Sequence, residues 1–221
     1  MKKSLSILSI FFTFSFLLSA CGSQQTQQGE EVPGKEVELA GDEADETPVD
    51  TSQVVAYNPR DTVVNVNESQ INDLLRAHTS VVVNTYLELG EALMQDDTEA
   101  ARDRAEQIRE MLERNEQENM ELQPQTKELY TNAAHIIRQS ARNLLAADTM
   151  PPIRTAYAAM APAAYKLAKI SDFNGQDLYY QFCPEALEGE GAYWLSRTAE
   201  INNPYGENDS MKNCGETVGG I

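Results

Sequence analysis

Residues 68–95, ESQINDLLRAHTSVVVNTYLELGEALMQ, decide the fold of this chain. Their apolar side chains return every three or four positions, which is the spacing of one face of an amphipathic α-helix. The positions are Ile71, Leu74, Leu75, Val81, Val82, Leu89, Ala92 and Leu93. We therefore predict a helix here, ended by Asp96-Asp97-Thr98, whose side chains can cap a following helix.

Three further segments have the same helical period. The first spans residues 98–117, and the second begins at Pro124, a residue accepted at the first helical position, and runs to residue 147. The third follows Asp148-Thr149 and again has prolines at its start. Four amphipathic helices joined by short connections predict an all-α fold, an antiparallel four-helix bundle over residues 68–171.

The composition changes in residues 172–221, which hold most of the turn-forming residues together with Trp194. Asn174-Gly175 is a turn signal, and residues 177–182 can form a short strand. We expect an irregular tail, with a short strand or hairpin, that packs on the bundle as part of the same domain.

The N-terminus has the pattern of a lipoprotein signal peptide. Two lysines precede an apolar run over residues 5–18, and small residues stand immediately before Cys21. The run is shorter than the roughly 20 residues that a transmembrane helix needs. We predict a signal peptide over residues 1–20 and a lipid anchor, with fatty acyl chains, on Cys21.

Such an anchor places the chain in the cell envelope, outside the cytoplasm. Gly22-Ser23 lacks the aspartate that marks retention at the inner membrane in some bacteria, which favours the outer membrane of a Gram-negative cell. Residues 21–67 have almost no periodic apolar pattern and carry a run of acids, so we expect a lipidated, acidic, flexible tether.

The charge of the chain limits its partners. With 17 Lys and Arg against 35 Asp and Glu, the formal net charge is −18. This charge repels nucleic acid and anionic membrane surfaces, so we expect no nucleic-acid partner. It leaves cations, cationic partners, or a role in solubility alone.

Once Cys21 carries lipid, Cys183 and Cys214 are the two remaining cysteines. In an oxidising compartment two thiols are most simply a disulfide. That bond would close a loop of about 30 residues and contribute on the order of 3 to 4 kcal/mol.

Four sequence blocks follow one another in the tail. They are Cys183-Pro184-Glu185-Ala186, Gly191-Ala192-Tyr193-Trp194-Leu195-Ser196, Asn203-Pro204-Tyr205 and Met211-Lys212-Asn213-Cys214-Gly215. In this order they resemble the domain of unknown function found at the C-terminus of heavy-metal (copper or silver) efflux periplasmic adaptors and in stand-alone periplasmic or lipid-anchored bacterial proteins. Residues 86–97 and the segment from Ile153-Arg154 to Tyr157 are also similar, so the resemblance covers about residues 68–215.

The resemblance implies a role in heavy-metal handling, next to a metal-efflux protein of the envelope. Cys183, Met211 and Cys214 are then candidate ligands, because Cu(I) and Ag(I) prefer soft sulfur donors. The family has a methionine after Cys-Pro, where this chain has Glu185, a hard ligand. A Cys183–Cys214 disulfide would remove both thiolates, so a metal-binding domain and a disulfide-stapled structural or interaction domain remain two alternatives.

The sequence has no signature of an enzyme. It contains no glycine-rich phosphate loop, no Gly-x-Ser-x-Gly elbow and no His-Glu-x-x-His, and its two histidines are far apart. We therefore expect a binding or structural protein and no catalytic site.

Overall fold

The computed structural model describes residues 73–115, 122–171, 173 and 177–221. The predicted signal peptide, the lipidation site Cys21 and the tether of residues 21–67 lie outside the described residues. All described residues belong to one compact unit. No helix within these ranges combines the length and the apolar character that crossing a membrane requires.

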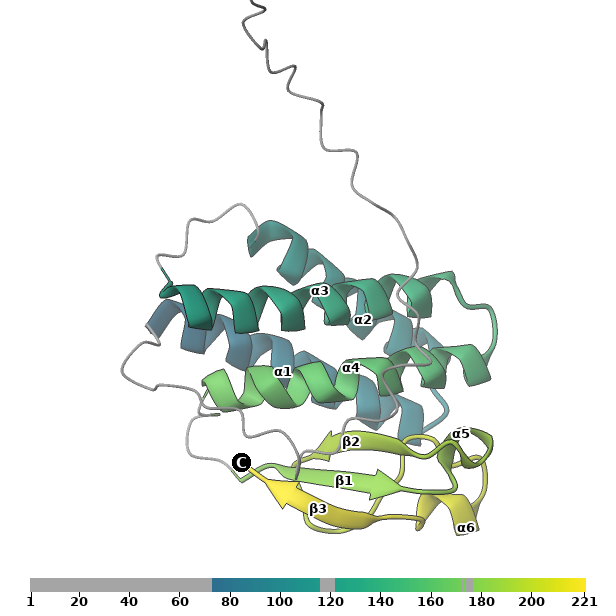
Figure 1. Cartoon of the computed structure of the whole chain (residues 1–221). Coiled ribbons are helices and arrows are strands. Elements are labelled where there is room, and N and C mark those ends of the chain that lie inside the picture. Colours follow the sequence, from purple (N-terminus) through teal and green to yellow (C-terminus); the bar gives the residue numbers. More distant parts are fainter. Residues whose placement is uncertain (1–72, 116–121, 172, 174–176) are drawn as a thin grey trace, which may run out of the picture. The chain divides into compact units, whose positions relative to one another are not determined.

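The four helices predicted from the apolar period are present. They are α1 (Asp73–Met94), α2 (Thr98–Asn115), α3 (Pro124–Ala146) and α4 (Met150–Ser171). Each helix packs on its neighbours in the chain, and α1 also packs on α4 (Figure 1). At the short connection between α1 and α2, the Asp97 side chain accepts a hydrogen bond from the backbone N–H of Ala100 at 2.9 Å and so caps the start of α2.

The buried face of α1 differs in part from the predicted stripe. Leu74 and Val81 are 58% and 51% exposed, whereas Val83 and Tyr86 are fully buried. The predicted stripe lies one position too early along parts of the helix, because three consecutive valines at 81–83 leave the apolar period ambiguous. The core side of α1 is instead centred on the line through Val82, Tyr86, Leu89 and Leu93.

The expectation of an all-α fold holds only in part, because the described residues are mostly helical but the tail contains a regular sheet. The C-terminal residues form a three-stranded antiparallel sheet in the order β2-β1-β3, with β1 at Tyr179–Cys183, β2 at Ala192–Ser196 and β3 at Glu216–Gly220. The predicted short strand corresponds to β1. Its pairing with β3 joins residues more than 30 positions apart, for example Phe182 with Glu216, and so left no local signal.

We call residues 177–221 the cap. It also contains two short helices, α5 (Ala186–Gly189) and α6 (Asp209–Lys212). The strand β2 packs on α4 and, less extensively, on α1 (Figure 1). Within the described part of the chain, the cap therefore contacts α1 and α4, two of the four helices.

Aromatic side chains fill the boundary between the helices and the cap. Tyr86 and Tyr157 stack with their ring centroids 4.7 Å apart, and Tyr157 is 5.8 Å from Tyr205 of the cap. Trp194, fully buried on β2, meets Tyr205 edge to face at 6.0 Å. Large buried rings of this kind contribute much of a core's apolar burial, so the cap and the helices share one core.

Candidate binding cleft between helix α4 and the cap

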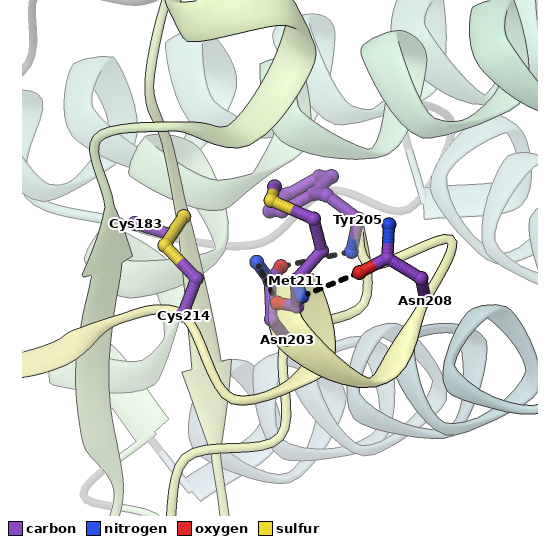
Figure 2. The surroundings of a disulfide bond; sticks show 6 residues. All are labelled: Cys183, Asn203, Tyr205, Asn208, Met211 and Cys214. Atoms are coloured by element: carbon purple, nitrogen blue, oxygen red, sulfur yellow. Dashed lines mark hydrogen bonds between the residues drawn. A yellow bond between two sulfur atoms is a disulfide. The ribbon is translucent and has the colours of Figure 1, made fainter.

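A disulfide joins Cys183, the last residue of β1, to Cys214, which precedes β3. The S–S distance is 2.09 Å and the Cα–Cα distance is 5.5 Å (Figure 2). Cys183 is fully buried. The disulfide alternative from the sequence is therefore present, and it fastens β1 to the chain that enters β3.

Met211, the third predicted sulfur ligand, lies on α6 close to this bond. The backbone N–H of Cys214 donates to the Met211 carbonyl at 3.1 Å. The structure thus brings Cys183, Met211 and Cys214 into one region. In the oxidised form these three residues do not fit a Cu(I) or Ag(I) ion. The sulfur atoms of Cys183 and Cys214 are bonded to each other, so neither is available as a thiolate ligand.

The described ranges offer no alternative metal site built from His, Cys, Asp or Glu side chains. Among those residues, no three or more His, Cys, Asp or Glu side chains are grouped so that they could hold a metal ion. Glu185 is exposed.

The Asn-Pro-Tyr block forms a loop that Asn203 holds together. The Asn203 side chain is fully buried, donates to the Met211 carbonyl at 3.0 Å and accepts from the Tyr205 N–H at 2.9 Å (Figure 2). Asn208 caps α6 by accepting from the Met211 N–H at 3.0 Å. Because an amide supplies both donor and acceptor, one asparagine fixes the loop and α6 relative to each other.

Arg154 on α4 fastens this loop to the helices. Its guanidinium donates to the carbonyls of Pro204 and Gly206, both at 3.1 Å, and to the carboxylate of Asp96 at 2.7 Å. A more distant contact, 3.4 Å, reaches Glu207. The Arg154 side chain is only 4% exposed, so these partners are what makes burial of its charge tolerable.

A cleft of about 580 Å³ lies between α4 and the cap. One wall is α4, through residues that include Thr155, Ala158 and Pro162. The opposite wall combines the α5 turn with Tyr193, Tyr205, Asn208 and Met211. Figure 2 shows the last three of these side chains together with the disulfide that joins β1 to the chain entering β3.

The cleft has aromatic and acidic parts. The Tyr205 hydroxyl donates to the Tyr193 carbonyl at 2.6 Å, and burial holds the pKa of Tyr205 well above its ordinary value, so this phenol stays neutral. The negative charge of the cleft therefore comes from carboxylates. Four glutamates line it: Glu185, Glu188, Glu190 and Glu207.

The backbone of the α5 turn is unusual. Leu187 and Glu188 have φ values of 53° and 61°, in the left-handed region that residues other than glycine rarely adopt. Two consecutive residues of this kind are costly, and such conformations are concentrated at ligand clamps and other functional sites. With these backbone angles, Leu187 and Glu188 both line the cleft.

Reasoning from the sequence missed several of these residues. The sequence marks Arg154 only as part of a segment that resembles the family, and Asn203 only as part of the Asn-Pro-Tyr block. The signal available for Arg154 was an arginine in an otherwise apolar helix face, between Ile153 and Tyr157. The cleft itself had no signal, because its walls come from segments that meet only through tertiary packing.

This geometry defines a class of protein: a helical domain that carries a small C-terminal sheet crosslinked by a disulfide. Residues 82–175 match the family model described as "Protein of unknown function (DUF3347)". The match confirms the predicted resemblance over these residues. The match covers most of α1 and all of α2 to α4 and ends before β1, so the tail blocks lie outside it. Searches of curated proteins and of solved structures found no significant match.

Proposed function

We propose that the chain is a lipid-anchored binding protein of the bacterial cell envelope. Cys21 carries the lipid, residues 21–67 act as an acidic spacer, and the helices form an antiparallel four-helix bundle that supports the cap. The protein works outside the cytoplasm, at the outer membrane of a Gram-negative cell. Its role is to bind an envelope protein and neither to catalyse a reaction nor to bind nucleic acid.

The observation that supports this proposal most is a cleft whose walls are held in place before any ligand binds. One wall is a helix, and the other is tied to it by Arg154 and closed by the Cys183–Cys214 disulfide. A volume of about 580 Å³ is in the range of ligand sites, roughly 300 to 1,000 Å³. A preformed site loses less conformational entropy on binding, so its contacts contribute more fully to affinity.

Site-specific photo-crosslinking in the native bacterium tests this proposal. A photoreactive phenylalanine replaces Ala158, in the cleft, or Glu128, an exposed residue of α3, in the full lipidated chain. We expect one discrete adduct with an envelope protein from the Ala158 position and none from the Glu128 position. No adduct at Ala158, or the same adduct from both positions, contradicts a binding role for the cleft.

Membrane attachment is tested separately. Cys21→Ser is expected to abolish incorporation of labelled fatty acid and to release the chain from membranes, whereas Cys214→Ser is expected to leave both unchanged. Labelling that persists in Cys21→Ser contradicts the anchor.

Soft-metal binding is a second candidate, and one observation favours it: the cap brings three sulfur side chains, those of Cys183, Met211 and Cys214, into one region. It requires reduction of the disulfide first. Titration of the reduced chain with Cu(I) against a competing chelator tests it. Affinity no greater than that of a Cys183→Ser/Cys214→Ser variant contradicts metal binding, and thiol counting by mass spectrometry shows which form cells contain.

A further inference from the structure

We infer that the cleft binds a basic, partly apolar segment of a partner protein, with lysine or arginine side chains placed between the α5 turn and α4. This inference rests on the proposed function and adds the chemistry of the partner. It follows from the charge of one lip of the cleft, the apolar surface of its two walls and a helical carbonyl that lacks its ordinary donor.

The charge is concentrated on the α5 turn. Glu185, Glu188 and Glu190 are exposed and line the cleft, and no salt bridge within the described part of the chain neutralises them. Arg154 is the cation that lines the cleft, and its guanidinium is already directed to Asp96 and to two carbonyls. The lip therefore presents uncompensated negative charge to whatever enters.

The apolar parts of the two walls suit the aliphatic stem of a long cationic side chain. Ala158, Pro162, Tyr193 and Met211 supply an apolar surface, and Tyr193 is half-buried, so part of this residue remains accessible. Lysine and arginine cover apolar surface with their methylene groups while their charged ends stay in polar surroundings. An aromatic ring adds attraction for the cation where the geometry allows it.

Pro162 leaves a hydrogen-bond acceptor without its ordinary donor on the α4 wall of the cleft. Proline has no backbone N–H, so in α4 the carbonyl of Ala158 lacks the donor that the residue four positions later ordinarily supplies. Ala158 and Pro162 both line the cleft. A ligand that carries N–H donors, as ammonium and guanidinium groups do, matches this carbonyl and the glutamates together.

Other occupants fit less well. An anionic ligand would be repelled by the glutamates. A bare divalent cation lacks a suitable cage, because the described residues include no cluster of three or more His, Cys, Asp or Glu placed to hold one. The size of the cleft fits a few side chains of an extended segment and not a folded domain.

Fluorescence anisotropy tests the inference with the full lipidated chain in non-ionic detergent. The probe is a fluorescein-labelled decapeptide in which lysines alternate with leucines and alanines, compared with a peptide that has glutamate at the lysine positions. We expect the lysine peptide to bind and the glutamate peptide not to bind. Binding should weaken as salt rises, because the charges involved are exposed.

Matched variants separate the cleft from the general negative charge of the protein. Glu185→Gln/Glu188→Gln/Glu190→Gln removes three charges from the lip and is expected to weaken binding about tenfold. Asp103→Asn/Glu110→Gln/Glu128→Gln removes three exposed charges from α2 and α3, outside the cleft, and is expected to change binding less than twofold. Equal losses in the two variants would show diffuse attraction and overturn the inference.

A third variant tests the shape of the site at constant charge. Ala158→Leu places a larger side chain in the cleft and is expected to weaken binding several-fold without lowering the thermal stability of the chain. Unchanged binding in Ala158→Leu places the peptide elsewhere and overturns the inference. Spermidine that competes as strongly as the peptide would identify a small amine as the ligand, which also overturns it.

The two proposals fail in different ways. A specific photo-adduct at Ala158 together with no binding of the lysine peptide overturns the basic segment and leaves the binding role of the cleft intact. Absence of the adduct removes the binding role in cells, whatever the peptide does in solution.

Discussion

The guanidinium of Arg154 lies 2.7 Å from the carboxylate of Asp96, 58 residues earlier in the chain. Asp96 stands in the turn between α1 and α2 with a φ of 57°, and Arg154 is in the first turns of α4. The same guanidinium also holds the Pro204 and Gly206 carbonyls of the cap. One side chain therefore joins the helix turn, α4 and the Asn-Pro-Tyr loop.

We expect Arg154→Lys to lower the free energy of unfolding by about 2 to 3 kcal/mol. An ammonium is a point donor and cannot reproduce the fork that serves two carbonyls and a carboxylate, so buried acceptors lose charged hydrogen bonds. Asp96→Asn, by contrast, should cost less than about 1 kcal/mol, because Asp96 is 51% exposed and asparagine also tolerates a positive φ. Urea unfolding measures both, and equal costs would contradict the dominant role of the carbonyls.

Gly90→Ala should destabilise the protein by about 1 to 3 kcal/mol. Alanine is favoured over glycine in a helix by about 1 kcal/mol, but a Cβ at this position would lie closer than 3.0 Å to the buried Tyr157 hydroxyl and 3.1 Å from its Cζ. Overpacking therefore exceeds the helical gain. Thermal unfolding should show partial rescue of Gly90→Ala by Tyr157→Phe.

Gly219→Ala is the control for this prediction. A Cβ at Gly219 meets its nearest neighbour, the Cβ of Tyr180, at an ordinary distance of 3.9 Å. We expect a change within about 0.5 kcal/mol. A loss at Gly219 as large as the loss at Gly90 would show that packing against Tyr157 is not the cause.

Reduction of the disulfide should lower the free energy of unfolding by about 3 to 4 kcal/mol, because the bond restricts a loop of 31 residues in the unfolded chain. Cys183 is fully buried, so reduction of the native protein should be slow unless the cap opens first. Thermal unfolding with and without reductant measures the loss. The Cys183→Ala/Cys214→Ala variant should be insensitive to reductant, and a reductant effect in that variant would point to another cause.

Arg102→Gln should cost about 1 to 2 kcal/mol. Arg102 on α2 donates to the carbonyls of Leu145 and Ala147 at 2.6 and 2.5 Å, at the end of α3, which has no basic residue in its last turn. A cation at this end satisfies terminal carbonyls and opposes the negative end of the helix dipole. Hydrogen exchange should speed up at the C-terminal end of α3 and not at its start. Uniform acceleration along α3 would contradict this local role.

Stability should fall at alkaline pH. Burial raises the pKa of Tyr130 to about 12 and holds the pKa of Tyr86 and Tyr157 well above the ordinary value near 10. The folded state therefore keeps protons that the unfolded state releases. The contribution of these tyrosines to stability is complete below pH 10 and declines as pH rises, from about pH 10 to pH 12 for Tyr130. Absorbance at 295 nm against pH, in native and in denatured protein, measures the difference.

Tyr130→Phe is the matched variant for the pH prediction. It removes the hydroxyl that pairs with His78 Nε2 at 3.0 Å and should flatten the alkaline decline by up to about 2 kcal/mol. The same decline in Tyr130→Phe and in the unmodified chain would assign the effect to the other buried tyrosines.

Local pattern predicted the helices well and the cap poorly. The starts of α2 and α3 follow from Asp97 as a cap and Pro124 as a first residue, both of which act on their own turn. The strand β1 could be anticipated, but its partner β3 could not, because pairing of Phe182 with Glu216 depends on the path of the chain between them.

The candidate site shows the same limit. The cysteines, Met211 and the Asn-Pro-Tyr block were visible as residue types, and the sequence left a metal centre and a disulfide both open. The choice depends on distance: Cys183 and Cys214 have their Cα atoms 5.5 Å apart, within the range that a disulfide spans. Arg154 could not be assigned because its partners lie 50 to 58 residues away.

By itself, the amino-acid sequence determined four helices, the presence of the domain of unknown function and the residue types of the cap, because apolar period, capping and ordered motifs act over a few neighbouring positions. Only the tertiary structure decided that the cap is a sheet, that its cysteines are joined and that a cleft with an acidic lip lies beside α4. Each of these depends on contacts between distant residues, whose geometry is settled by the packing of the whole core.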